Sequence, residues 1–385
     1  MNIENEFFST SIFGASIEFG IGALRNLALR LKEFNASKLL IVTDTGIIKA
    51  GIMDKVLDQL DTPDIKYSIF ADVQPNPIDK NVMDGLDAYR ENDCDATLGV
   101  GGGSPLDVAK AIRVVVTHPG HISEYYHPAK IEGEMPVLIA IPTTSGSGAE
   151  VSTGSIITDT RCNRKMVVRC GPPSLALVDP DLTAGMPPFL TAAAGMDALS
   201  HSIEAYVSKR YNPLAGAIAL AGIKLVAENL RHAVENGSDI KARRNMALAS
   251  TMGALAFTRG LGAVHSLAHQ LSTDADIPHG VANAIMLPHV MEFNLEFAVR
   301  EYADIAQAMG ANIQKLSNME AAESSVAAVR QLSHDTGLPD RLSALGMKEE
   351  IIPIMAAKAM QDHCHINNPR ECTEESMAAL YKAAF

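Results

Sequence analysis

Short runs of apolar residues alternate with amphipathic stretches through the first half of the chain. Runs rich in branched apolar side chains are typical of strands buried on both faces. These runs are 38–43, 66–73, 96–100 and 136–142. Stretches with the apolar spacing of helices separate them, at 47–60, 78–92 and 105–117. The alternation predicts an α/β fold with a parallel sheet, whose ligands bind at the carboxyl ends of the strands.

From residue 187 onward the pattern changes to long helical repeats with few strand-like runs. The clearest repeats are 212–235, 240–257, 296–309 and 374–384. A chain of 385 residues exceeds the usual size of one hydrophobic core, so two domains are expected. Prolines and glycines cluster at 180–188, where they break regular structure. We therefore predict an α/β domain over 1–184 and an all-helical domain over 185–385.

Composition narrows the classes of function. A hydrophobic share of 47% with 20% charged residues is typical of a soluble globular protein. A net charge of −13 disfavours nucleic acids and anionic membranes as partners. The five cysteines are odd in number and have no CxxC spacing, which argues against a disulfide framework. The amino terminus has Glu4 and Glu6 but no basic residue before Arg25, unlike a secretory signal, and no apolar run looks long enough to span a bilayer, so a cytoplasmic protein is expected.

A glycine run, GVGGGSPLDVAK at 99–110, follows one predicted strand and opens the next predicted helix. Glycines let the backbone approach a ligand closely, and a helix N-terminus attracts phosphate. Ser104 is expected to cap this helix, with Pro105 at its first position. A tight turn would not need three consecutive glycines, so we favour phosphate binding.

Two further stretches follow predicted strands and offer groups for a cofactor. PTTSGSGAE at 142–150 has hydroxyls at Thr143, Thr144 and Ser147, although such clusters are often only loops. Asp44 follows the first of the buried runs, where a carboxylate can accept hydrogen bonds from a ribose and repel a 2′-phosphate. An Asx turn or helix cap at Asp44 is an equally good interpretation.

Two compact segments concentrate potential metal ligands. Asp197 and His201 are four residues apart, as are His265 and His269, and His279 follows in a Pro-His-Gly turn. Side chains at this helical spacing converge on one point, as ligands of a divalent cation must. Spacing alone does not say which histidine is not a ligand. His118, His121, His232 and His334 are interpreted as ordinary core or surface residues.

Together these segments resemble the iron-containing (group III) alcohol dehydrogenase family. The resemblance extends over essentially the whole chain. It rests on GGGSPLDVAK at 101–110, PTTSGSGAE at 142–150, Asp-Pro at 179–180, GMDALSHSIEAYVS at 195–208, HSLAHQL at 265–271 and PHGVANAIMLPHV at 278–290.

The resemblance implies an amino-terminal Rossmann-like NAD domain, a helical metal-binding domain and an active site in the cleft between them. It implies metal ligation by Asp197, His201, His265 and His279, with His269 beside the nicotinamide. The residues that it places at the cofactor are Gly101, Gly102, Gly103, Ser104, Asp107, Thr143, Thr144, Ser147, Asp44 and Lys165, the last in an expected hairpin.

The implied activity is that of an oxidoreductase that moves a hydride between NAD(H) and the carbonyl or alkoxide of a small aldehyde or alcohol bound to the metal. Fe(II) is expected, with Zn(II) and Mn(II) as alternatives. The family also suggests a homodimer or larger homo-oligomer. A lyase of the dehydroquinate-synthase type is the less favoured class, because the helical half has no clear basic phosphate pocket.

The sequence leaves two classes of substrate open. Arg259 and the polar run Ser272, Thr273 and Asp274 depart from the family pattern. If they line the pocket, the aldehyde carries a polar or anionic group, as sulfoacetaldehyde or a semialdehyde does. If Arg259 only caps a helix end, a neutral aldehyde such as lactaldehyde, 3-hydroxypropionaldehyde or acetaldehyde is expected.

Overall fold

The computed structural model describes residues 14–385, which form two compact units, 14–185 and 186–385. The acidic stretch that argued against a secretory signal lies outside the described residues. Each unit has a hydrophobic core of its own.

The first unit is built on a six-stranded sheet in the order β1-β8-β5-β4-β2-β3, with every pair parallel. The strands are β1 (Ser16–Phe19), β2 (Lys38–Val42), β3 (Lys66–Phe70), β4 (Ala96–Gly101), β5 (Val137–Pro142) and β8 (Leu175–Val178). The chain runs from β2 outward to β3 and then returns to the other side of β2 to form β4. The strand order therefore reverses at β2, which marks the carboxyl ends of β2 and β4 as the place where open α/β sheets bind ligands.

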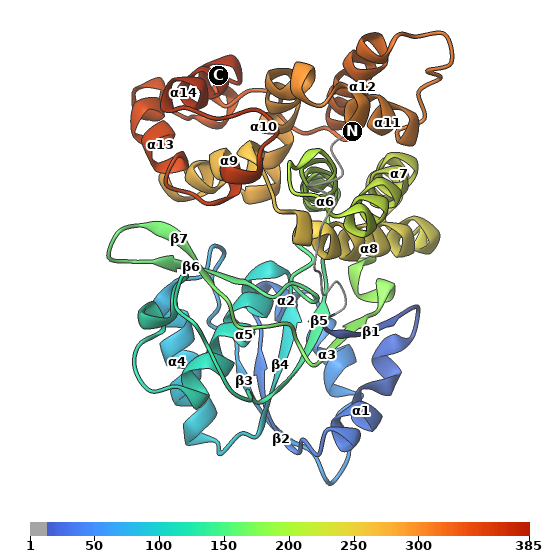
Figure 1. Ribbon diagram of the computed structural model, residues 1–385. Coiled ribbons are helices and arrows are strands. Elements are labelled where there is room, and N and C mark those ends of the chain that lie inside the picture. The colour runs from blue at the N-terminus through green and yellow to red at the C-terminus, as the bar shows by residue number, and fades with distance from the viewer. Residues whose placement is uncertain (1–13) are drawn as a thin grey trace. The chain divides into compact units, whose positions relative to one another are not determined.

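Helices cover both faces of this sheet (Figure 1). On β2, Leu39 and Ile41 join a core with α1 and α3, whereas Leu40 and Val42 join a core with α4 and α5. Alternate residues of a strand point to opposite faces, so a strand between two helical layers must be apolar throughout. The helices are α1 (Leu27–Glu33), α2 (Thr45–Lys49), α3 (Ile52–Leu57), α4 (Asp79–Glu91) and α5 (Gly103–Thr117).

Three details of this unit differ from the expectations. The single helix expected over 47–60 is divided, because Gly51 has a φ of 70°, a left-handed conformation that ends α2 before α3 begins. The helix after the glycine run begins at Gly103 with Gly102 as its N-cap, so Ser104 lies inside the first turn and caps nothing. The short strands β1 and β8 were not predicted. The expected hairpin is present as β6 (Ser155–Asp159) and β7 (Arg164–Val168).

The second unit is helical, as expected. Its helices are α6 (Pro188–Val207), α7 (Pro213–Glu235), α8 (Ile240–Leu255), α9 (Ala263–Asp274), α10 (His279–Asn294), α11 (Val299–Ala308), α12 (Asn318–Asp335), α13 (Ile352–Ala359) and α14 (Glu374–Ala383). The short 3₁₀ helices η5 (Ala256–Arg259) and η9 (Cys364–Asn367) matter for the site.

Helix α6 is buried on nearly all sides, and two glycines let its neighbours approach closely. A Cβ atom on Gly280 of α10 would lie 2.3 Å from the Ala193 carbonyl oxygen. A Cβ atom on Gly253 of α8 would lie 3.2 Å from the His201 Cβ. Only a glycine at position 280 therefore allows the start of α10 to lie this close to α6.

Helix α7 corrects one expectation, since it is long and apolar enough, by length and composition, to cross a membrane. Its apolar window is 44% buried, and the helix packs against α6 and α8. We interpret α7 as a core helix of the second unit.

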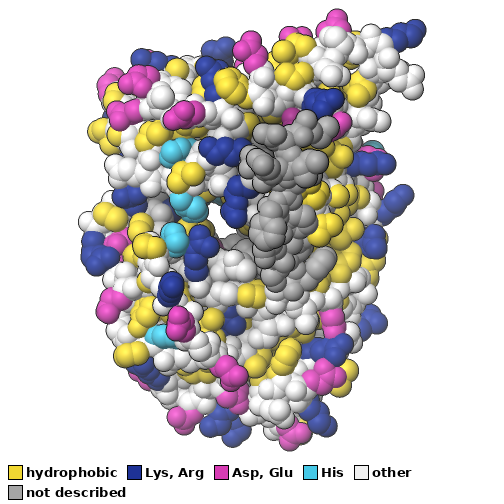
Figure 2. Space-filling view, in the orientation of Figure 1, with side chains coloured by type: hydrophobic (Ala, Val, Ile, Leu, Met, Phe, Trp, Pro, Cys, Tyr) yellow, Lys and Arg dark blue, Asp and Glu magenta, His cyan; other side chains and the backbone are white. Residues whose placement is uncertain are grey.

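Acidic and basic side chains are interspersed over the visible face of the molecule (Figure 2).

Candidate metal centre and cofactor loops

Helices α6, α9 and α10 bring the predicted metal-binding side chains together. Asp197 and His201 project from one face of α6, His265 from α9, and His279 is the first residue of α10. Helix α10 packs against both α6 and α9. His279 is partly exposed, and the other three side chains are buried.

The imidazoles of these three histidines converge on a single oxygen, Oδ1 of Asp197. Their Nε2 atoms lie 3.5 Å (His201), 3.7 Å (His265) and 3.6 Å (His279) from it. These distances are too long for good hydrogen bonds. They are close to about 3.4 Å, the separation of two ligand atoms in a tetrahedral site with bonds of about 2.1 Å. The distances from the Asp197 oxygen therefore fit those between ligand atoms of one cation.

The donor set also fits a divalent cation chemically. The ligand atoms of Asp197, His265 and His279 all lie within 4.8 Å of one another, and the ring of His201 stacks on that of His265. Burial alone would raise the pKa of Asp197, but His201, His279 and His265 hold that pKa well below its usual range. Imidazoles bound to a cation would be neutral, so one ionised carboxylate and three imidazoles would leave a divalent cation with net positive charge, which can polarise a substrate oxygen.

A carboxylate behind His265 was not predicted. The Nδ1–H of His265 donates to Glu204 Oε2, and Glu204 Oε1 accepts the Val264 N–H at 2.7 Å. This bond turns Nε2 of His265 toward Asp197. Burial lowers the pKa of His265, but Glu204 and Asp197 outweigh burial and raise it to about 9. Glu204 lies one helical turn after His201, so helical spacing could have revealed it.

Asn283 is a second residue that sequence reasoning missed. Its Nδ2 donates to Asp197 Oδ1 at 2.7 Å and lies 3.2 Å from Nε2 of His279. Asn283 follows His279 by four residues on α10, so both side chains lie on one face of the helix. The amide fixes the orientation of the Asp197 carboxylate.

His269 lies beside these four residues, but its Nδ1 bonds elsewhere. Its ring stacks on that of His279, with centroids 5.4 Å apart, and its Nδ1 lies 2.8 Å from Oδ2 of Asp362. Asp362 lies between α13 and η9, 93 residues further along the chain, and no spacing in the sequence pointed to it.

The residues predicted to line a polar substrate pocket have partners inside the helical unit. Arg259 donates from Nε to the Arg210 carbonyl at 3.1 Å and from a terminal nitrogen to the Ser208 carbonyl at 2.9 Å. Since Ser208 is the C-cap of α6, this is the helix-end interaction that was the alternative interpretation of Arg259.

The polar run at the end of α9 is likewise engaged. Ser272 Oγ donates to the Ala268 carbonyl at 3.1 Å, and Thr273 Oγ1 donates to the His269 carbonyl at 3.2 Å. Asp274 pairs with Lys358 at 2.6 Å. These contacts within the protein explain why polar residues occur at the end of α9, and no bound substrate is needed to explain them.

In the α/β unit, the two loops predicted to bind the cofactor lie next to each other. Gly101 and Pro142 end the paired strands β4 and β5, and the Thr143 N–H donates to the Gly101 carbonyl at 2.9 Å. A Cβ atom on Gly102 would lie 3.3 Å from Thr144 Cγ2, and one on Gly103 would lie 3.0 Å from Ser147 Oγ.

This arrangement suits a pyrophosphate. The N-terminus of α5 has no side-chain cap, so its N–H groups are available to phosphate oxygens. Thr143 Oγ1 and Ser145 Oγ are buried without a hydrogen-bond partner in the described part of the chain. The residues of both loops therefore fit a bound dinucleotide.

Two charged residues predicted at the cofactor, Asp44 and Asp107, have structural partners. Asp44 caps α2 by accepting the Ile47 N–H at 3.0 Å, which is the alternative interpretation of that residue. Asp107 pairs with the fully buried Lys110 at 2.8 Å and accepts the Ile156 N–H at 3.0 Å, which fastens the hairpin to α5. Lys165 lies on β7 opposite Thr158.

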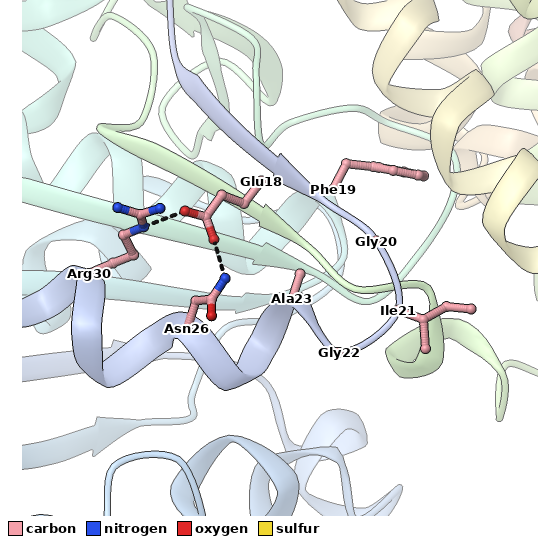
Figure 3. A pocket seen from close by; sticks show the side chains of 8 residues that line it. All are labelled: Glu18, Phe19, Gly20, Ile21, Gly22, Ala23, Asn26 and Arg30. Atoms are coloured by element: carbon pink, nitrogen blue, oxygen red, sulfur yellow. Dashed lines mark hydrogen bonds and ion pairs between the residues drawn. The ribbon is translucent and has the colours of Figure 1, made fainter.

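A surface pocket of about 370 Å³ lies elsewhere on this unit, beside β1 (Figure 3). The turn Gly20–Gly22 forms one wall, and Glu18 accepts hydrogen bonds from Asn26 at 2.9 Å and from Arg30. The pocket is at the edge of the sheet and contains no predicted site residue.

Comparison with known proteins agrees with both units. Residues 15–180 match the model of the iron-containing alcohol dehydrogenase family, and residues 191–385 match that of the C-terminal domain of the same family. The chain is 44% identical over 372 residues to 1,3-propanediol dehydrogenase of Klebsiella pneumoniae, covering 95% of this chain and 96% of that protein. It is 39% identical over 368 residues to the NAD-dependent methanol dehydrogenase of Bacillus methanolicus, covering 95% and 97%.

A crystal structure of 1,3-propanediol oxidoreductase has a TM-score of 0.96 and 42% identity, covering 98% of this chain and all of that one. The chain therefore belongs to the iron-containing alcohol dehydrogenase family. It is an NAD-dependent alcohol dehydrogenase or aldehyde reductase. The family predicted from the sequence motifs is confirmed.

Proposed function

We propose that this enzyme interconverts a short, uncharged alcohol and its aldehyde, with NAD(H) and one divalent cation. The cation is held by Asp197, His201, His265 and His279. The observation that carries this proposal is the convergence of three imidazoles on one oxygen of an ionised carboxylate. When bound, the cation supplies electrostatic stabilisation of the substrate oxygen as its charge changes.

The residues of the chain itself bind and orient. In this proposal residues 1–184 form the NAD-binding domain, with Gly101–Ser104 at the pyrophosphate and Thr143, Thr144 and Ser147 on the neighbouring strand end. Asp44 and Asp107 contribute at the ribose and the pyrophosphate only in addition to their structural contacts, and Lys165 of β7 contributes at the ribose. Residues 185–385 form the metal-binding domain, in which Glu204 and Asn283 orient the ligands.

The proposed substrate is uncharged for two reasons. The guanidinium of Arg259, which suggested an anionic aldehyde, is bonded to two backbone carbonyls. Two relatives at 44% and 39% identity are named for 1,3-propanediol and methanol, which are both small and uncharged. Ser272, Thr273 and Asp274 are not needed for such a substrate.

The direct test is an NADH-oxidation assay of the Fe(II)-loaded enzyme across short aldehydes that are neutral, sulfonated, phosphonated or carboxylated. We expect the highest kcat/KM for a neutral aldehyde of one to three carbons. The variant Arg259→Ala should leave the ratio of activities on charged and neutral aldehydes unchanged. A preference for an anionic aldehyde that disappears in Arg259→Ala would overturn this assignment.

We further propose that the native metal is Fe(II) and that the enzyme is a cytoplasmic homo-oligomer. Family membership supports iron, while an Asp-His₃ set also accepts Zn(II) or Mn(II). Metal analysis of anaerobically prepared protein tests the first point. Light scattering coupled to gel filtration tests the second.

A further inference from the structure

Helix α9 carries two histidines one turn apart, and a different buried carboxylate holds each of them. His265 donates from Nδ1 to Glu204, and His269 donates from Nδ1 to Asp362. The two histidines differ in the carboxylate oxygens that lie near their ring nitrogens. Nε2 of His265 lies 3.7 Å from Oδ1 of Asp197, whereas Nδ1 of His269 lies 2.8 Å from Oδ2 of Asp362.

Asp362 is held rigidly by donors to both of its oxygens. Oδ1 accepts the Ser266 hydroxyl at 2.9 Å and the Cys364 N–H at 2.8 Å, while Oδ2 lies 2.8 Å from His269 Nδ1. Ser266 Oγ in turn accepts the His365 N–H at 2.9 Å, so its own proton must point to Asp362. The direction of each bond in the chain from His365 to Asp362 is therefore fixed.

Burial would raise the pKa of Asp362, but His269 and the Cys364 N–H hold that pKa well below its usual range. An ionised carboxylate only accepts hydrogen bonds, so the proton between the two residues belongs to His269 Nδ1. A neutral imidazole has one protonated nitrogen. Its Nε2 must then carry the lone pair.

His269, Asp362 and Cys364 also lie close enough together to hold a metal ion. However, both oxygens of Asp362 already have hydrogen-bond donors, and burial beside Asp362 raises the pKa of the Cys364 thiol well above its usual value. Thiolate, rather than thiol, binds metals. A hydrogen-bonded network explains this cluster better than a second metal site.

We propose that Asp362 is a positioning residue that holds the Nδ1–H of His269 and so makes Nε2 the atom that exchanges the substrate proton. In alcohol oxidation the C–H bond breaks with its electron pair going to NAD⁺, which becomes NADH. The O–H bond breaks and its proton passes to Nε2, and from there to solvent. Aldehyde reduction reverses both transfers. This inference rests on the proposed function, because it assigns the proton step of that reaction.

The test is Asp362→Asn, which keeps the shape of the side chain but offers an amide N–H₂ to Nδ1. The ring can then adopt the opposite tautomer, with the proton on Nε2. We expect kcat for alcohol oxidation to fall about 100-fold, the usual range for a lost acid or base. The KM values should change less than about threefold, since no binding contact is removed. Metal content should stay at that of the wild type.

The tautomer can be observed without any turnover. In Zn(II)-loaded protein labelled with ¹⁵N-histidine, the ring signals of His269 are assigned by their loss in His269→Gln. We expect a protonated Nδ1 in the wild type and a protonated Nε2 in Asp362→Asn. Asp362→Glu, which keeps the carboxylate, should recover part of kcat. The matched control Asp335→Asn removes an exposed carboxylate paired with Arg231 and should change neither kcat nor the His269 signals.

Several results would overturn the inference. A protonated Nε2 of His269 in the wild type would do so even if Asp362→Asn failed to fold. So would a kcat of Asp362→Asn within threefold of the wild type, or a loss of metal in parallel with kcat. By contrast, a wild-type enzyme that shows the expected tautomer but does not oxidise short alcohols would refute the proposed substrate and leave the Asp362 contact intact.

Discussion

The two units make their candidate sites in different ways. In the helical unit, side chains from three helices converge, and the Nε2 atoms of His201, His265 and His279 lie 3.5 to 3.7 Å from one oxygen of Asp197. In the α/β unit, the candidate site consists of glycines, small hydroxyl residues and a helix N-terminus. There, the charged residues Asp44 and Asp107 are bonded to the fold itself. A site made of side chains can be read from residue types, whereas one made of backbone is read from strand ends and glycines.

Removal of a ligand should give the largest effect. We expect His265→Ala to lose metal and lower kcat by roughly a thousandfold or more, since a catalytic cation contributes several kcal/mol. His269→Ala, one helical turn away, should retain metal while losing activity. Metal analysis and steady-state kinetics check both variants, and loss of metal in both would remove the distinction between the two histidines.

The next largest effect is expected at Glu204, whose carboxylate accepts a hydrogen bond from His265. Glu204→Gln is expected to weaken metal binding by about 10- to 100-fold, because a ligand histidine loses the group that orients it and makes it more basic. Competition with a chelator measures the affinity. The matched substitution Asp335→Asn on the surface of the same unit should leave the affinity unchanged. Equal affinities for Glu204→Gln and wild type would show that the contact is only structural.

In the α/β unit, the corresponding prediction concerns folding. Lys110→Met should destabilise this unit by about 3 kcal/mol, because it leaves Asp107 without its buried partner. Urea unfolding followed by circular dichroism measures the loss. Lys80→Met, which removes an exposed pair with Asp84, is the control and should have a much smaller effect. An equal effect of the two variants would contradict the structural role of Asp107.

A smaller effect is expected at Asp44. Asp44→Ala should cost about 1 kcal/mol through loss of the α2 cap. If the carboxylate also faces the ribose, the preference for NADH over NADPH should fall as well. Comparison of kcat/KM with the two cofactors separates the roles, and a lower stability with an unchanged preference would leave Asp44 as a cap alone.

The smallest expected effect on activity comes from chemical labelling of the cysteines. Cys162 is exposed, whereas burial raises the pKa of Cys94 and Cys372 to about 11 and raises that of Cys364 well above its usual value. Since thiolates are the reactive form, iodoacetamide at pH 8 should label Cys162 first, with little loss of activity. Peptide mapping by mass spectrometry locates the label. Early labelling of Cys364 would show that the region around Asp362 opens readily.

The sequence was most informative where the spacing of residues along the chain matches the period of a helix or a strand. Helical spacing placed Asp197 with His201 on one face, and the strand-like runs predicted four of the six sheet strands. The other two, β1 and β8, are short, so their patterns were too weak. Helix α2 stopped early because Gly51 took a left-handed conformation, which a glycine permits but does not require.

By itself, the sequence determined the fold class and the family, and it indicated the residue types of the candidate metal site, since these follow from local spacing and motifs. Tertiary structure alone decided how the histidines of α9 differ. Their carboxylate partners, Glu204 and Asp362, come 61 residues before one histidine and 93 residues after the other. Contacts between residues so distant depend on how helices pack, and no periodicity along the chain records that packing.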